Sequence, residues 1–237
     1  MRRHLLLLGL VAALLLRMAP ARAQDSEGWP EEMKLAIVGM MLTNLFSDHP
    51  AFSSVAQAQF QFPGQAMSMQ AGICRLDEKF RIYVDTANTG GVSTPAANNL
   101  LKAFGIDRMV TILCLDKGIA WQLFPGLQGY VEVKLDWAAA KSETNTLRTV
   151  RIDKAPVGED SIDGRVCSKS QLMGSVKGSE FRPVGFIWQG KAMKGFPLQL
   201  ELNTAGLGLN LKLKDVKTVR LDAKLFEVPP GYKRLDN

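Results

Sequence analysis

The sequence has few residues of the kinds that carry out most enzyme and metal chemistry. It contains two histidines, His4 and His49, and three cysteines, Cys74, Cys114 and Cys167. A zinc site needs histidine, cysteine and carboxylate side chains grouped at ligand spacing, and no such group occurs. A serine–histidine–acid triad has only His49 available beyond the first residues, and no Gly-x-Ser-x-Gly motif accompanies it. We therefore expect no enzyme, no metal site and no cofactor, and we interpret His49 as a surface or helix-capping residue.

Motifs for nucleotide or calcium binding are missing as well. Gly206-Leu207-Gly208 lacks the third glycine and the following helix of a dinucleotide-binding turn. The acidic stretch 158–164 has the wrong acid spacing for a calcium loop, and we predict that it is a tight turn between two strands. A pair of carboxylates suited to glycoside hydrolysis depends on a three-dimensional separation, so a hydrolase stays open as a third alternative behind two noncatalytic functions.

Positive charge is concentrated at the N-terminus. The formal net charge is +6, and residues 1–23 hold four arginines and no acid. They combine a charged start, an apolar run from Leu5 to Leu16 and the ending Ala21-Arg22-Ala23, which are the three parts of a secretory signal peptide. The apolar run is too short to span a bilayer as a helix, which takes ~20 residues. We predict cleavage after Ala23, export to the periplasm and a mature chain with no transmembrane segment.

The charge of the mature chain excludes one class of partner. Loss of the four arginines in residues 1–23 reduces the net charge from +6 to +2. Nucleic-acid binding requires a concentrated basic surface that releases counterions from phosphates. We therefore expect no nucleic-acid partner.

The cysteines set a second expectation about the exported chain. Disulfides persist outside the cytoplasm, and three cysteines allow one bridge from three alternative pairings. Cys114 and Cys167 lie in predicted strands, where a small apolar thiol packs well. We expect no more than one bridge and favour free buried thiols.

Only a few stretches of the sequence predict a helix. Proline and acids in Trp29-Pro30-Glu31-Glu32 favour a helix start. Apolar residues then recur at three- and four-residue steps from Leu35 to Leu45, which is typical of an amphipathic helix ending before Asp48. A second helix is predicted from Pro95 through Phe104, and residues 136–145 are interpreted as a short helix or a lid.

Period-two alternation, the pattern of half-buried strands, dominates the chain from Phe52 onward. The predicted strands are residues 52–62, 67–73, 80–85, 109–114, 119–124, 130–135, 165–173, 181–189, 197–203, 206–214 and 219–222. No linker rich in proline, glycine and serine divides them. We predict a signal peptide (1–23), a lead with one helix (24–50) and a single mainly β domain (51–237).

The clearest amphipathic pair is the late hairpin of residues 197–203 and 206–214. On each strand, leucines alternate with polar residues or glycine, and a short turn joins the two. Antiparallel pairing then brings all the leucines onto one face. A sheet with one apolar face buries it against helices, against another sheet or against an apolar ligand, and the pattern leaves these alternatives open.

Several stretches of the chain share the motifs of a known group of proteins. They are residues 109–112 continuing to 124–132, residues 158–164 with Cys167, Trp188 followed by Lys194–Leu198, and the ending 225–232. The Phe-x-Val-Pro-x-Gly-Tyr ending is the most specific of them. Together they resemble an exported bacterial family of unknown function and, over roughly residues 50–235, are similar to the LolA/LolB-like superfamily of the periplasmic lipoprotein carrier and its outer-membrane receptor.

The resemblance implies a mainly β fold: a single curved antiparallel sheet, an open half-barrel with two or three helices on its concave side. In the carrier, the apolar cavity shields acyl chains during transit across the periplasm. No catalytic residue and no individual ligand contact carries over to this chain. The Pro229-Pro230-Gly231-Tyr232 stretch is expected to end the last strand, with Tyr232 covering one edge.

Two noncatalytic functions follow. The first is binding or carriage of an apolar ligand, such as a lipid or lipoprotein acyl chain, in the concave face. The second is an envelope module that binds a protein partner and whose interior is filled by its own helices. For the first, the predicted ligand-binding residues are Leu198, Leu200, Leu202, Leu207, Leu209, Leu211 and Leu213, with Phe186 or Trp188 beside them.

Overall fold

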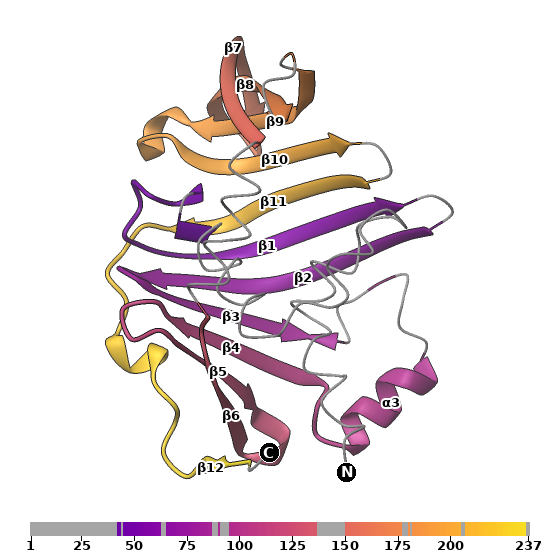
Figure 1. The fold of residues 1–237 in the computed structure, drawn as a ribbon, viewed down its shortest axis with the longest axis vertical. Coiled ribbons are helices and arrows are strands. Elements are labelled where there is room, and N and C mark those ends of the chain that lie inside the picture. The colour runs from indigo at the N-terminus through magenta and orange to yellow at the C-terminus, as the bar shows by residue number, and fades with distance from the viewer. Residues whose placement is uncertain are drawn as a thin grey trace.

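A computed structural model of the chain describes residues 42–43, 45–62, 65–86, 90, 95–136, 150–176, 180, 182–204 and 207–235. The predicted signal peptide, most of the first predicted helix and residues 137–145 lie outside these ranges. The described residues form one open sheet of twelve strands, in the order β12-β6-β5-β4-β3-β2-β1-β11-β10-β9-β8-β7 (Figure 1). Neighbouring strands are antiparallel except β12, which pairs parallel to β6.

The strand bounds follow the alternation in the sequence closely. They are β1 (Ala51–Phe62), β2 (Gln65–Leu76), β3 (Lys79–Asp85), β4 (Arg108–Cys114), β5 (Ile119–Phe124), β6 (Gly129–Lys134), β7 (Val150–Ile162), β8 (Arg165–Val176), β9 (Arg182–Gly190), β10 (Phe196–Thr204), β11 (Leu207–Lys217) and β12 (Lys233–Arg234). The predicted second helix is confirmed as α3 (Pro95–Ala103). Leu42, Thr43 and Leu45, at the end of the first predicted helix, are also helical.

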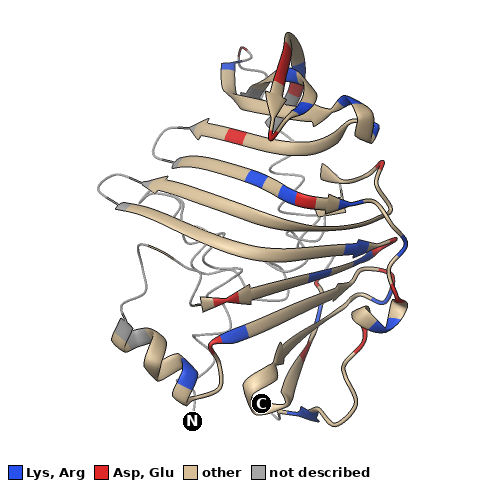
Figure 2. Ribbon diagram, turned by 180° about the vertical axis from the view of Figure 1, so that it is seen from behind, with Lys and Arg blue, Asp and Glu red and all other residues tan. Residues whose placement is uncertain are grey.

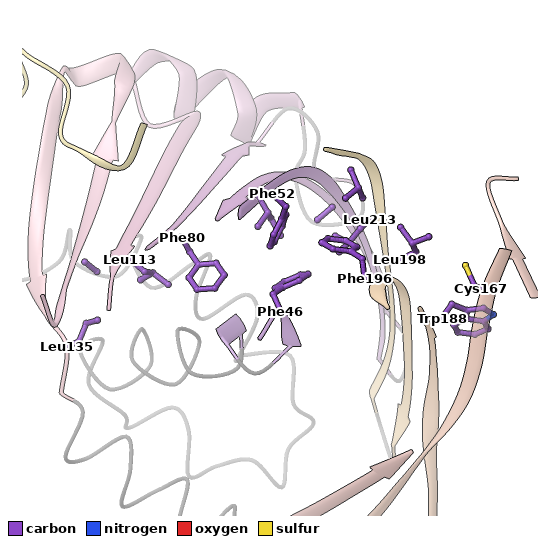
Figure 3. Close-up of a cluster of buried hydrophobic side chains, with 14 residues drawn as sticks. Phe46, Phe52, Phe80, Leu113, Leu135, Cys167, Trp188, Phe196, Leu198 and Leu213 are labelled. Atoms are coloured by element: carbon purple, nitrogen blue, oxygen red, sulfur yellow. The ribbon is translucent and has the colours of Figure 1, made fainter. Parts of the chain in front are cut away.

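The sheet curves around its main core. Figure 3 shows Phe80, Phe52 and Phe196 on the inner side of the curve, with Phe46 beneath them. Phe46 comes from the helical segment before β1, and its ring centroid lies 4.5 Å from that of Phe52. The buried Arg75 side chain donates a hydrogen bond to the Phe46 carbonyl and so holds this segment against the sheet. The N-terminal segment therefore contributes directly to the core.

The outer side of the sheet carries a second, smaller core. Ile112 and Cys114 alternate with the inner residue Leu113 on β4, and all three are buried. Phe226, in the short 3-10 helix Ala223–Phe226, packs against this outer cluster. Arg81 Nη1 donates to the Leu225 carbonyl at 2.9 Å. The C-terminal segment thus covers part of the outer face before it pairs with the edge of β6.

Three local predictions are wrong. No strand occurs at residues 219–222, because the chain leaves the sheet there to reach the outer face, and Val219 is exposed. Pro229–Tyr232 does not end a strand but forms a turn ahead of β12, and the half-buried Tyr232 packs with the outer cluster. Within the stretch 158–164, only Asp163 and Gly164 form the turn, since residues 158–162 belong to β7.

Strand β7 was not predicted from the sequence, and its exposure explains why. It is the last strand of the sheet, and residues 153–161 are all exposed. A strand exposed on both faces has no buried side to impose alternation, so its sequence shows no period-two pattern.

Candidate functional site

Four of the predicted leucines, Leu200, Leu202, Leu209 and Leu211, share the inner side of the sheet. Leu200 pairs directly with Leu211, and Leu202 pairs with Leu209. On the other side of β11, Leu209 and Leu211 pair with Phe60 and Ala58 of β1. Directly paired residues of antiparallel strands point to the same face. The leucines therefore continue the surface that carries Phe52 and the inner core.

The leucines differ in how deeply they are buried. Leu198 and Leu213 are buried, whereas Leu200, Leu202, Leu209 and Leu211 are only half-buried. Leu207 pairs with Thr204, but its side chain lies outside the described residues. The row thus has a buried end at Leu198 and Leu213 and a partly accessible stretch beyond it.

Neighbouring apolar side chains extend this face across β1 and β2. Phe60, Met67 and Met69 are buried, and Leu209 and Leu211 pack against their cluster. These three residues are not among the ligand-binding residues predicted from the sequence. The signal was present, because Phe60 alternates with Gln59 and Gln61, but the pairing of β1 with β11 joins segments distant in the sequence.

Phe186 and Trp188, which the sequence places beside the leucine face, point to the side opposite Leu200 and Leu202. Trp188 pairs with Gln199 and Phe186 pairs with Glu201, so both rings share a face with the polar residues of β10. An irregular register between Pro197 and Gln199 brings Leu198 into the same buried cluster as Trp188.

The two aromatic rings contact a lysine of β8. Lys169 Nζ lies 4.9 Å from the Phe186 ring centroid and 4.7 Å from that of Trp188. Trp188 Nε1 donates to Asp160 Oδ2 at 3.0 Å, which lowers the pKa of Asp160. These contacts tie β7, β8 and β9 together.

A cavity of about 290 Å³ lies where the β7–β8 turn meets the ends of β10 and β11. Two of the predicted leucines, Leu198 and Leu213, line it, and the remaining lining residues are Ile162, Asp163, Arg165, Lys214 and Asp215. The charged lining residues were not predicted from the sequence. The turn and β11 are brought together only by the curl of the sheet, and no local motif marks that contact.

Charged side chains at this cavity are coupled to one another. Lys212 Nζ donates to Asp163 Oδ1 at 2.7 Å. This hydrogen bond is the main cause of a lowered pKa at Asp163, with further contributions from the charges of Lys212, Lys214 and Arg165. Three cations therefore converge on one carboxylate.

The histidines, cysteines and carboxylates elsewhere in the described residues do not form a second candidate site. In the described ranges, no group of three or more histidine, cysteine, aspartate or glutamate side chains is arranged to hold a metal ion. None of the described helices has the length and apolarity needed to cross a bilayer. The three cysteines are free thiols. His49 is buried rather than at the surface, because it packs against Phe196 in the core.

Comparison with known proteins gives likeness of structure only. No protein-family model matches the sequence, and no curated protein matches it. A LolA-superfamily protein of Nitrosomonas europaea is 12% identical, with 83% of this chain and 96% of that chain covered and a TM-score of 0.34. The lipoprotein LppX of Mycobacterium tuberculosis is 8% identical, with 76% and 94% covered and a TM-score of 0.38. The MucA/MucB complex of Pseudomonas aeruginosa matches at 12% identity, with 83% of this chain and 62% of that chain covered and a TM-score of 0.40.

Proposed function

We propose that the protein is exported after cleavage following Ala23 and binds an apolar ligand, without catalysis, on the inner leucine face. The ligand class is a lipid or the acyl chain of a lipoprotein. The observation that carries the proposal is the half-buried row of Leu200, Leu202, Leu209 and Leu211 on the inner side of a curved sheet. Large apolar side chains on a concave surface gain free energy when an apolar group covers them, about 0.8 kcal/mol for each CH₂ group removed from water.

The surface around the row suits an acyl chain. Met67 and Met69 lie on the same inner face, and methionine adapts its shape to irregular apolar partners. No charged residue interrupts the leucine row, because the charged and amide residues of β10 and β11 point to the other face. An apolar chain laid along the row would meet no polar group that lost its hydration.

Native mass spectrometry tests the proposal, with lipid extraction after purification from the native envelope. Leu209→Gln is compared with Asn210→Gln, because these neighbours on β11 point to opposite faces and receive the same side chain. We expect bound lipid in the wild type, a severalfold loss in Leu209→Gln and no loss in Asn210→Gln. Thermal unfolding of both variants shows whether each remains folded. A wild type free of lipid, or full lipid occupancy in a folded Leu209→Gln protein, would contradict the proposal.

A protein partner is the second candidate function, and strand β7 favours it. This strand forms one end of the sheet, and unpaired backbone groups at a sheet edge are a template for an added strand. Pro156 and the register shift between Pro156 and Gly158 limit pairing to the parts of the strand on either side. Envelope proteins recovered by cross-linking at β7, together with absence of lipid, would favour this function over the first.

A further inference from the structure

The cavity at the end of the leucine row has an apolar floor and a charged mouth. Ile162, Leu198 and Leu213 supply apolar lining and belong to the main core or pack against it. The charged lining comes from the β7–β8 turn and from the irregular end of β11. This division of chemistry matches an amphiphile, whose apolar part and headgroup need opposite surroundings.

The mouth carries more positive than negative charge. Arg165, Lys212 and Lys214 are the cations, and Asp163 and Asp215 are the carboxylates (Figure 2 shows Lys and Arg in blue and Asp and Glu in red). Lys212 is engaged with Asp163 at 2.7 Å. Among the described residues, neither Arg165 nor Lys214 forms a salt bridge, although Arg165 Nη1 donates to Met193 Sδ at 3.5 Å. Three cations against two carboxylates leave the mouth with one excess positive charge. An added anion would therefore be attracted.

The volume of the cavity limits the size of the ligand that it can hold. Sites for drug-sized ligands span roughly 300–1,000 Å³. A cavity of about 290 Å³ lies at the lower limit, and so it holds a headgroup with the first part of a chain rather than a complete lipid. The rest of the chain then needs an apolar surface outside the cavity. Leu213 shares its face of β11 with Leu211 and Leu209, which supply that surface. Lys214 points to the other face, so the cavity is lined from both faces of β11.

We propose that this cavity is a headgroup site that selects anionic amphiphiles, with Arg165 and Lys214 binding a phosphate or carboxylate. The proposal rests on the proposed function and adds to it the chemical class of the ligand. Arg165 offers a planar set of N–H donors suited to two oxygens of such a group, and Lys214 adds a point charge. Asp163 competes with the ligand for the same cations, because it already draws on their positive charge.

Two lysolipids with the same acyl chain provide the probes: lysophosphatidylglycerol, which is anionic, and lysophosphatidylcholine, which is zwitterionic. Their dissociation constants are measured with delipidated wild-type protein below the critical micelle concentration. We expect a preference of about tenfold for the anionic lipid, the size expected for one charge-assisted hydrogen bond. The Arg165→Gln, Lys214→Gln double variant should lose this preference and bind the zwitterionic lipid as the wild type does.

Two further variants sharpen the test. Lys217→Gln removes an exposed cation three residues from Lys214 and should leave the preference unchanged. Asp163→Asn removes the competing carboxylate at an exposed position and should increase the preference severalfold. It also keeps the test decisive if the double variant does not fold.

The outcomes separate this inference from the proposed function. Equal binding of both lysolipids by the wild type, or an unchanged preference in the folded double variant, would overturn the headgroup site and leave apolar binding intact. Failure of both lysolipids to bind would instead count against the proposed function. Inorganic phosphate that binds as tightly as the anionic lysolipid would overturn the lipid part of the proposal, because the acyl chain would then contribute nothing.

Discussion

The His49 imidazole lies edge-on to the Phe196 ring, with ring centroids 4.9 Å apart and an interplanar angle of 62°. Phe196 also contacts Phe46 and Phe52, so the histidine completes an aromatic cluster that joins the N-terminal segment to β1 and β10. Burial lowers the pKa of His49 below its ordinary value, and the charges of Arg75 and Lys194 act in the same direction. The charge of Asp48 and a backbone hydrogen bond at Gly195 oppose this shift. The neutral imidazole is therefore the form that fits the fold.

The first prediction is a loss of stability with acid that originates at His49. Because the folded-state pKa is lowered, the unfolded chain takes up a proton first as the pH falls below about 6.5, and unfolding becomes more favourable. His49→Gln removes this titration. We expect the unfolding free energy from urea titrations to fall between pH 7 and pH 5 in the wild type and to change less in the variant. Parallel pH profiles for the two proteins would refute the assignment.

The second prediction concerns the C-terminal segment on the outer face. Phe226 is 1% exposed, whereas its neighbour Leu225 is 41% exposed. Removal of a buried phenylalanine side chain costs about 3–5 kcal/mol, and truncation at the exposed position should cost less than about 1 kcal/mol. Phe226→Ala and Leu225→Ala are compared by denaturant unfolding. Equal losses would mean that the segment does not pack as described.

The third prediction separates the packed from the accessible end of the leucine row. Leu213 is 3% exposed, and Leu213→Ala should destabilise the protein by about 2–5 kcal/mol. Leu209 is half-buried, and Leu209→Ala should cost roughly 1–2 kcal/mol because less apolar area is returned to water. Unfolding free energies of the delipidated variants provide the measurement. A full core-sized loss at Leu209, with no lipid bound by the wild type, would place the partner-binding function ahead.

The fourth prediction is that all three thiols are free and slow to react. Burial raises the pKa of Cys74, Cys114 and Cys167, so little of the reactive thiolate is present at neutral pH. Thiol counting in denaturant without reductant should give three groups. In the native protein, Cys74 should be alkylated first, because it is half-buried while the other two are buried. A count of one group in denaturant would reveal a disulfide.

Local sequence determined most of the strands and one complete helix. Strands with one buried face were predicted because burial imposes period-two alternation, as at Leu209, Leu211 and Leu213. The register places Leu200, Leu202, Leu209 and Leu211 on one face. Helix α3 was predicted from its proline start and apolar spacing. These features need only a few neighbouring residues and the chemistry of side chains in water.

The tertiary structure decided what sequence patterns do not encode. A period of two predicts that successive side chains point to opposite faces of a strand. It does not predict the register irregularity near Leu198, because of which Phe186 and Trp188 point away from Leu200 and Leu202. Residues 153–161 of β7 are exposed on both faces, so only the pairing of β7 with β8 defines this strand. The 2.7 Å contact between Lys212 and Asp163 spans 49 residues and exists because the curled sheet brings the β7–β8 turn to β11. The leucine face could therefore be read from the sequence, whereas the charged cavity at its end depends on long-range closure of the chain, for which local spacing carries no signal.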